Sequence, residues 1–316
     1  MTVLITGGAG FIGSNVVKDF NEAGCDDIII VDRLGKSEKW KNLIGLKYRM
    51  YLELDVFDSW YDHNKTALYE NLKAVIHLGA CSNTQERDMG YLAMNNYICS
   101  QKMYALAQRA DVPFIYASSA ATYGNLGFHD DFSEQIPLID LKPTNAYGMS
   151  KHMFDLYMNR GNKFDKNVYG LKFFNVFGSG EDHKVGMRSF VRVAIEAIFS
   201  QNEMNFFDTA ASRDFVYVKD VAKLILDFYI HKPQSGIYNV GSGVATPLVN
   251  IADVVSMKLH KKLCNKLFTL RTPQGYQDFT RANMTKTHRT FPHFKWTPID
   301  EAIDEYIGEL KRDCYF

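Results

Sequence analysis

The feature that most constrains the fold is a glycine-rich turn between a short apolar run and an amphipathic segment. Residues 3–5 form an apolar run typical of a buried strand, and residues 13–22 carry apolar side chains at helical spacing. Between them, Gly8, Gly10 and Gly13 satisfy the pattern G-x-G-x-x-G. Such glycines allow a tight turn, a close backbone approach to a pyrophosphate and close packing of the helix on the strand. The start of the chain therefore predicts a dinucleotide-binding unit.

The same alternation continues along the chain. Further apolar runs at 28–31, 74–77, 114–117 and 171–176 read as strands, and 94–109 reads as a long helix. Near-continuous apolar strands that alternate with helices indicate a parallel sheet covered on both faces. We therefore predict an α/β fold with a Rossmann-type, doubly wound parallel sheet.

Beyond residue 178 the pattern loosens, which indicates a second and smaller unit. We expect residues 1–175 to form the cofactor-binding domain, with 215–240 returning to it. Residues 176–214 and 241–316 are then expected to form an interleaved α/β substrate-binding domain. No linker or repeat separates the two.

Composition excludes several classes of function. The 316 residues hold 36 basic and 36 acidic side chains, so the formal net charge is zero. This balance argues against a partner such as nucleic acid or an anionic membrane. No apolar run approaches the roughly 18 residues that span a bilayer, and the first residues lack a signal-peptide pattern, so a cytoplasmic protein is expected. Five cysteines without C-x-x-C, and histidines without a recognised ligand spacing, predict no metal site.

The second predicted strand ends on a carboxylate suited to a cofactor ribose. Asp32 lies 19 residues after Gly13, where a carboxylate binds the adenosine ribose of a dinucleotide. Arg33 and Lys39 beside it could pair with a 2′-phosphate, which favours NADP and leaves NAD possible. The alternative is a solvated basic loop.

A tyrosine and a lysine are placed for acid–base chemistry. Tyr147 and Lys151 lie four residues apart, on one face of a predicted helix for which Thr144 is the expected N-cap. A phenol has an ordinary pKa near 10. A neighbouring ammonium and the positive helix end are expected to stabilise the phenolate and lower that pKa. The hydroxyls of Ser118 and Ser119 follow a predicted strand, at the sheet edge where such folds bind ligands.

Together these motifs resemble the extended short-chain dehydrogenase/reductase family. The resemblance implies that Tyr147 is the acid/base, that Lys151 orients the nicotinamide ribose and that a serine hydroxyl hydrogen-bonds the reacting oxygen. Ser119, four residues before Tyr123, matches that serine, and Ser118 is the neighbour most easily confused with it.

A narrower resemblance points to one subgroup, the 6-epimerases of ADP-heptose. The segments 77–82, 117–124, 174–178, 183–184 and 213–218 are similar to that subgroup, in order along almost the whole chain. The resemblance implies inversion of C6″ of ADP-D-glycero-β-D-manno-heptose through transient oxidation to a 6″-ketone, with NADP bound. It also implies bacterial lipopolysaccharide biosynthesis, a nucleotide-sugar partner and a homo-oligomer, commonly a pentamer.

Site residues follow from this resemblance by position. The cofactor is expected at Gly7, Gly10, Phe11, Ile12, Gly13, Asp32, Arg33, Lys39, Leu78, Gly79, Ala80, Cys81, Ser82, Asn95, Lys151, Val176 and Lys184. The substrate is expected at Ser119, Asn175, Gly186, Phe207, Asp208, Thr209, Ala210, Arg213 and Tyr276.

Two of these residues have open roles. Lys184 matches a second catalytic base, beside Tyr147, Lys151 and Ser119, or is a plain ligand contact. Arg213 suits a diphosphate clamp, because a guanidinium pairs phosphate oxygens bidentately, or forms a structural pair with Asp214.

Three positions depart from the subgroup. It carries Glu where this chain has Leu78, Asn where it has Arg33, and Ser where it has Gly186.

Three alternative functions share part of this pattern: a 4,6-dehydratase, a UDP-hexose 4-epimerase and a non-enzymatic NADP sensor. A 4,6-dehydratase would carry Asp-Glu directly after the serine, where this chain has Ala120 and Ala121. A UDP-hexose 4-epimerase shares the catalytic residues and remains an alternative. A non-enzymatic NADP sensor would keep the glycine turn but lose the tyrosine or lysine, and this chain keeps both.

Overall fold

A parallel seven-stranded sheet forms the base of the molecule. The computed structural model describes residues 2–126, 132–161, 163–200, 204–206, 211–261, 266–268 and 277–312. The strand order is β10-β6-β5-β4-β1-β2-β3, and every neighbouring pair is parallel. The strands are β1 Thr2–Thr6, β2 Ile28–Asp32, β3 Met50–Glu53, β4 Leu72–His77, β5 Phe114–Ser119, β6 Val168–Phe173 and β10 Gly236–Val240. The predicted doubly wound parallel sheet is confirmed.

Alternate side chains of these strands enter two separate cores. In β1, Val3 and Ile5 face one core, while Leu4 between them faces the other. The first core is closed by α1 (Phe11–Glu22) and α7 (Val218–His231). The second is closed by α2 (Leu54–Asn71), α4 (Cys99–Arg109) and α5 (Ala146–Met158). Because both faces are covered, both parities of strand residue are apolar, as the sequence pattern predicted.

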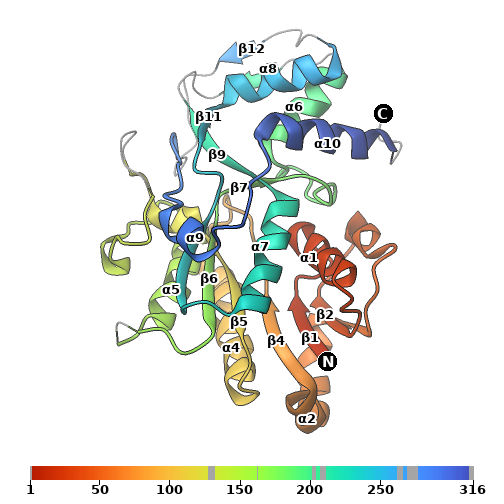
Figure 1. The fold of residues 1–316 in the computed structure, drawn as a ribbon, viewed down its shortest axis with the longest axis vertical. Coiled ribbons are helices and arrows are strands. Elements are labelled where there is room, and N and C mark those ends of the chain that lie inside the picture. The colour runs from red at the N-terminus through yellow and green to blue at the C-terminus, as the bar shows by residue number, and fades with distance from the viewer. Residues whose placement is uncertain are drawn as a thin grey trace.

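A smaller lobe stands at one end of this sheet, at the top of Figure 1. It contains the three-stranded sheet β11-β9-β7, with β7 Asn175–Phe177, β9 Ser212–Tyr217 and β11 Ala245–Pro247. Three helices, α6 (Phe190–Phe199), α8 (Leu248–Leu259) and α10 (Ile299–Arg312), pack around a third core. The remaining elements are α3 Met89–Leu92, α9 Thr285–Thr290, β8 Met204–Phe206, β12 Lys266–Phe268 and the short helices η1 Glu38–Leu43, η2 Ala93–Ile98, η3 Ala120–Tyr123 and η4 Leu138–Asp140.

The chain passes between the two sheets at places that sequence pattern does not mark. The run 171–176, expected as one strand, ends at Phe173 and resumes at Asn175, where it enters the smaller sheet. Within 215–240, β9 lies in the smaller sheet, whereas α7 and β10 belong to the larger one. Among the described residues, no helix combines the length and the apolar character needed to cross a bilayer.

Candidate active site

The glycine turn between β1 and α1 leaves no room for side chains. Gly7 has φ +71°, and a Cβ built there would lie 2.7 Å from the backbone nitrogen of Gly79. A Cβ on Gly13 would lie 2.0 Å from the carbonyl oxygen of Gly7. Helix α1 begins after Gly10, which provides no side-chain cap, so its first N–H groups are oriented to receive an anion. The turn therefore fits a dinucleotide pyrophosphate.

Asp32 closes β2 beside this turn and is 7% exposed. Its carboxylate accepts hydrogen bonds from the backbone of Ala9 (2.9 Å) and of Arg33 (2.7 Å), and from Lys39 Nζ (2.5 Å). The Arg33 guanidinium lies 2.6 Å from Asp55 on an exposed surface. Of the two predicted basic residues, Lys39 therefore contacts Asp32, whereas Arg33 pairs with Asp55.

The segment after β4 forms the facing wall. The backbone N–H of Gly79 donates to Thr6 Oγ1 at 3.0 Å. The backbone of Cys81 is held at both ends by the side chain of Asn96, which is fully buried. Asn95, the predicted cofactor residue, instead donates to the carbonyl of Tyr91 and is not part of the cleft lining. Asn96, which the sequence analysis did not single out, is the asparagine that holds the Cys81 backbone in place.

Helix α5 and the end of β5 bring the catalytic candidates together. Tyr147 lies in the first turn of α5, whose N-cap is Asn145, since its side chain accepts from the N–H of Gly148 at 2.7 Å. The expectation that Thr144 caps this helix is wrong. Ser119 is the last residue of β5 and hydrogen-bonds Tyr147.

Burial controls the protonation of both candidates on α5. It raises the pKa of the Tyr147 phenol above its ordinary value near 10, and the hydrogen bond with Ser119 acts in the opposite direction. Burial lowers the pKa of Lys151 to about 8. The Lys151 ammonium donates to the carbonyl of Ala117 at 3.0 Å. The direction at Tyr147 is opposite to the sequence expectation, because loss of water penalises the phenolate more than Ser119 stabilises it.

Lys184 approaches the same cleft from the smaller lobe. Its Nζ lies 5.3 Å from the ring centroid of Phe11, and burial lowers its pKa, while the Glu181 carboxylate acts to raise it. Glu181 is fully buried and accepts from both the backbone and the hydroxyl of Ser189. These hydrogen bonds between Glu181 and Ser189 hold the loop that carries Lys184 in one conformation.

These elements enclose one cleft of about 510 Å³ between the sheet edge and the smaller lobe. It brings together most of the predicted residues: Gly7, Gly10, Phe11, Ile12, Gly13, Asp32, Lys39, Leu78, Gly79, Ala80, Ser82, Ser119, Tyr147, Lys151, Asn175, Val176 and Lys184. Residues that were not predicted to contact ligand also line it, among them His183, Met187, Arg188 and Gln277.

Other predicted residues lie elsewhere. Arg213 is buried on β9, donates to the carbonyl of Ser212 at 3.1 Å and is not among the cleft-lining residues. Gly186 is exposed with φ +76° and has open space around its Cα. Residues 207–210 (Phe207, Asp208, Thr209 and Ala210) and Tyr276 lie outside the described residues.

A buried ion pair joins helix α5 to the larger sheet. Asp155, four residues beyond Lys151 on α5, accepts from Tyr116 Oη (3.0 Å) and Ser118 Oγ (2.7 Å), and pairs with Lys172 at 3.2 Å. Asp155 and Lys172 are 0% and 1% exposed. This pair was missed because both residues lie outside every recognised motif.

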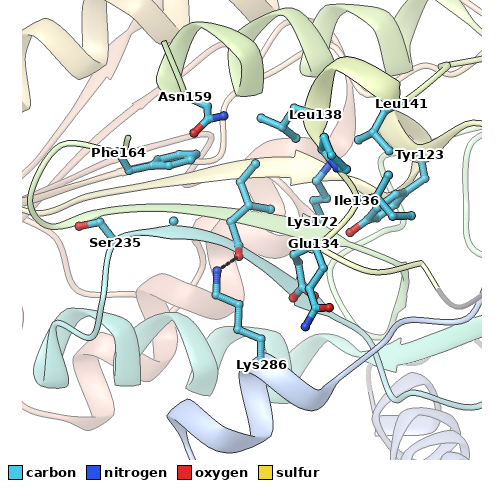
Figure 2. Close-up of a pocket in the computed structure, with 14 residues that line it drawn as sticks. Tyr123, Glu134, Ile136, Leu138, Leu141, Asn159, Phe164, Lys172, Ser235 and Lys286 are labelled. Carbon is cyan, nitrogen blue, oxygen red and sulfur yellow. Dashed lines mark hydrogen bonds between the residues drawn. The ribbon is translucent and has the colours of Figure 1, made fainter. Parts of the chain in front are cut away.

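Lys172 also reaches a second pocket, of about 250 Å³. Figure 2 shows it between Lys172, Glu134 and Lys286, with Phe164 and Asn159 at its other end. The Lys286 ammonium donates to the carbonyl of Ile237 at 2.6 Å, and Glu134 accepts from the backbone of Asn239 at 2.6 Å. The charged groups of this pocket thus have protein partners.

The chain is similar over most of its length to a known protein family and to named proteins. The model of the NAD dependent epimerase/dehydratase family matches residues 3–241. A protein of Nitratidesulfovibrio vulgaris (strain DP4) named ADP-L-glycero-D-manno-heptose-6-epimerase is 37% identical, with 97% of each chain covered. A protein of the same name from Fusobacterium nucleatum is 36% identical, with 99% of each chain covered.

Solved structures agree on the fold. The ADP-L-glycero-D-manno-heptose-6-epimerase of Helicobacter pylori has a TM-score of 0.82 at 25% identity and covers 98% of this chain and 96% of its own. The UDP-glucose 4-epimerase of Thermotoga maritima has a TM-score of 0.84 at 23% identity, with coverage of 99% and 100%. The family resemblance predicted from the motifs is confirmed, and the chain belongs to the NAD dependent epimerase/dehydratase family.

Proposed function

We propose that this chain is an epimerase that inverts C6″ of ADP-D-glycero-β-D-manno-heptose, in supply of heptose for a bacterial lipopolysaccharide core. The observation that carries the proposal is full-length similarity: relatives at 35–37% identity, over at least 96% of both chains, are named ADP-L-glycero-D-manno-heptose-6-epimerase. The cleft supports it. Ala120 and Ala121 follow Ser119, so these positions offer no carboxyl group for elimination of water.

The chain's own residues handle the proton and the orientation. Inversion of a secondary alcohol requires oxidation to a ketone and reduction from the opposite face. A nicotinamide dinucleotide, when bound, supplies the reversible hydride acceptor. The phenolate form of Tyr147 would take the hydroxyl proton; burial disfavours this form and the hydrogen bond with Ser119 favours it. Ser119 would hydrogen-bond the same substrate oxygen as it becomes a carbonyl. Lys151, held by the Ala117 carbonyl, lies one helical turn from Tyr147 and would position the ribose.

Lys184 is proposed as the second acid/base, for the orientation in which the substrate oxygen is out of reach of Tyr147. Its lowered pKa and its place in the cleft suit that role. Lys184→Met should then lower kcat by about 10²–10⁴-fold with little change in KM. If Lys184 only contacts ligand, the same variant raises KM and leaves kcat near that of the wild type.

NADP is proposed as the preferred cofactor, with NAD as the alternative. The support is Lys39, whose ammonium donates to Asp32, the carboxylate expected to bind the cofactor ribose. Titration of both dinucleotides should show tighter binding of NADP, and Lys39→Ala should remove most of the difference. Equal loss of NADP and NAD affinity in Lys39→Ala would contradict this assignment.

A cytoplasmic homo-oligomer, with a pentamer as the family precedent, is proposed from the resemblance alone. The absence of a membrane-crossing helix among the described residues is compatible with it. Sedimentation of the purified protein measures the stoichiometry.

The deciding experiment follows the substrate itself. The protein is incubated with ADP-D-glycero-β-D-manno-heptose, first without added cofactor and then with NADP, and the configuration at C6″ is followed by proton NMR. Conversion to the L-glycero epimer supports the proposal, and Tyr147→Phe is the inactive control. No conversion with NADP present, together with turnover of UDP-glucose to UDP-galactose, would replace the heptose assignment with a 4-epimerase.

A further inference from the structure

Three potential metal ligands meet on the surface of the larger sheet's helical layer. Asp227 and His231 lie four residues apart near the end of α7, and His293 follows α9. One ligating atom from each lies within 4.8 Å of the others. His293 Nε2 is 3.2 Å from Asp227 Oδ2, and His231 Nε2 is 3.8 Å from Asp227 Oδ1. We propose that these three side chains bind a divalent transition-metal ion of the Zn²⁺ class.

The donor set and spacing suit such an ion. Two imidazoles and one carboxylate are ligands that Zn²⁺, Co²⁺ and Ni²⁺ accept, whereas Mg²⁺ and Ca²⁺ prefer oxygen alone. Because Zn²⁺–ligand bonds are about 2.0–2.2 Å, two ligands of a tetrahedral site lie roughly 3.3 Å apart. The two aspartate–histidine separations bracket this value, and the three ligating atoms lie within 4.8 Å of one another, so rotations of the side chains would bring all three onto one ion.

Packing fixes the backbone that carries the ligands. Phe291, two residues before His293, is 1% exposed and meets Phe228 of α7 edge-on, with ring centroids 4.8 Å apart. His231 and His293 are 52% and 58% exposed, so water can complete the coordination. The site is therefore preformed in its backbone and open to solvent at the fourth position.

The ion would join two parts of the chain. Helix α7 belongs to the larger sheet, and the segment after α9 leads to α10 of the smaller lobe. The side chain of Asp220 on α7 already holds this segment, through the backbone (2.7 Å) and hydroxyl (2.8 Å) of Thr297. None of the three proposed ligands lines the cleft of the candidate active site. A bound ion would therefore raise the free energy of unfolding. Because it lies outside the cleft, it would take no part in the proposed epimerase reaction.

The sequence analysis predicted no metal site, and this proposal differs from that prediction. The sequence analysis did not recognise the four-residue spacing of Asp227 and His231 as a ligand pair, since a carboxylate and one imidazole do not by themselves make a site. The third ligand comes from a distant segment that only the fold brings near.

The test uses the full-length protein without an affinity tag, freed of metal by dialysis. Co²⁺ is titrated and the visible absorption of the bound ion is followed, with Zn²⁺ as the competitor. We expect saturation at one Co²⁺ per chain, displacement by Zn²⁺, and a rise in Tm of about 4 °C when Zn²⁺ stands at 100-fold its Kd. His231→Ala/His293→Ala should weaken binding by at least about tenfold and abolish the Tm shift.

Matched controls separate the site from general surface binding. His63→Ala removes an exposed histidine of α2 and should bind Co²⁺ as the wild type does. Asp227→Asn keeps the side-chain shape and should still weaken binding, because it removes the negative charge. Equal Co²⁺ affinity in the wild type and the double variant, or no saturation in the wild type, would overturn the proposal and leave an exposed histidine–aspartate contact.

Discussion

Removal of one partner from the buried Asp155–Lys172 pair should be strongly destabilising. In Asp155→Asn the hydrogen bonds can be partly kept, but the Lys172 ammonium stays buried without its countercharge. Breaking a buried pair in this way costs about 3–5 kcal/mol of unfolding free energy. For a chain of this length that cost lowers Tm by about 5–8 °C.

The reasoning predicts rescue by a second change. Lys172→Met in the Asp155→Asn background removes the remaining charge and should restore at least half of the lost stability. Urea unfolding followed by circular dichroism measures all three variants. Asp58→Asn is the matched control, because it breaks an exposed pair with Lys102 (2.7 Å) and should cost less than about 1 kcal/mol.

Two results would refute this account. The first is an Asp155→Asn variant no less stable than Asp58→Asn. The second is an Asp155→Asn/Lys172→Met double variant no more stable than Asp155→Asn alone. Either would mean that hydrogen bonds and packing, and not charge neutralisation, hold α5 against β5 and β6.

Three further predictions concern the cleft and the sheet. Gly13→Ala places a Cβ 2.0 Å from the Gly7 carbonyl oxygen, so the turn must shift. Dinucleotide affinity, measured by fluorescence titration, should then weaken by about 10–100-fold. Unchanged affinity would contradict the geometry of the turn. Tyr147→Phe should lower epimerase kcat by about 10²–10⁴-fold and leave KM nearly unchanged, whereas a change in KM alone would rule out proton transfer by this phenol. Burial lowers the pKa of His77 to about 3. Below about pH 6.5 the unfolded chain therefore binds a proton at His77 that the folded chain does not bind. The free energy of unfolding should fall by about 2 kcal/mol from pH 7 to pH 5 as a result. His77→Gln should remove that part of the pH dependence in urea unfolding at the two pH values, and an unaltered slope would show that other groups carry it.

Sequence pattern predicted the parts of the fold that rest on local rules. The glycine turn, the strands of the parallel sheet and the helix that carries Tyr147 all have periodic or steric signatures. The N-cap was misplaced by one residue because threonine and asparagine both cap helices, and only the fold shows that Asn145 reaches the N–H of Gly148.

The missed features depend on contacts between distant segments. Asp155 and Lys172 are ordinary charged residues in the sequence, and their burial against each other follows only once α5 lies on β6. The break at Phe174 was invisible for a related reason. Both β6 and β7 mix apolar residues with one strongly polar residue, Lys172 and Asn175, so no change of period marks the point where the chain leaves one sheet for the other.

The break at Phe174 is one of three points at which the chain passes from one sheet to the other, and these points determine which truncations of the protein can fold. The chain leaves the larger sheet at Phe174, returns to it after β9 and leaves again between β10 and β11. Any single stretch of sequence that contains all of one sheet therefore also contains at least one strand of the other. A truncation meant to isolate the nucleotide-binding half would lose β10, an edge strand, and α7, a whole covering helix. A break in the loop between β7 and α6 would leave each fragment with strands of both sheets, so the two pieces should stay associated and unfold together.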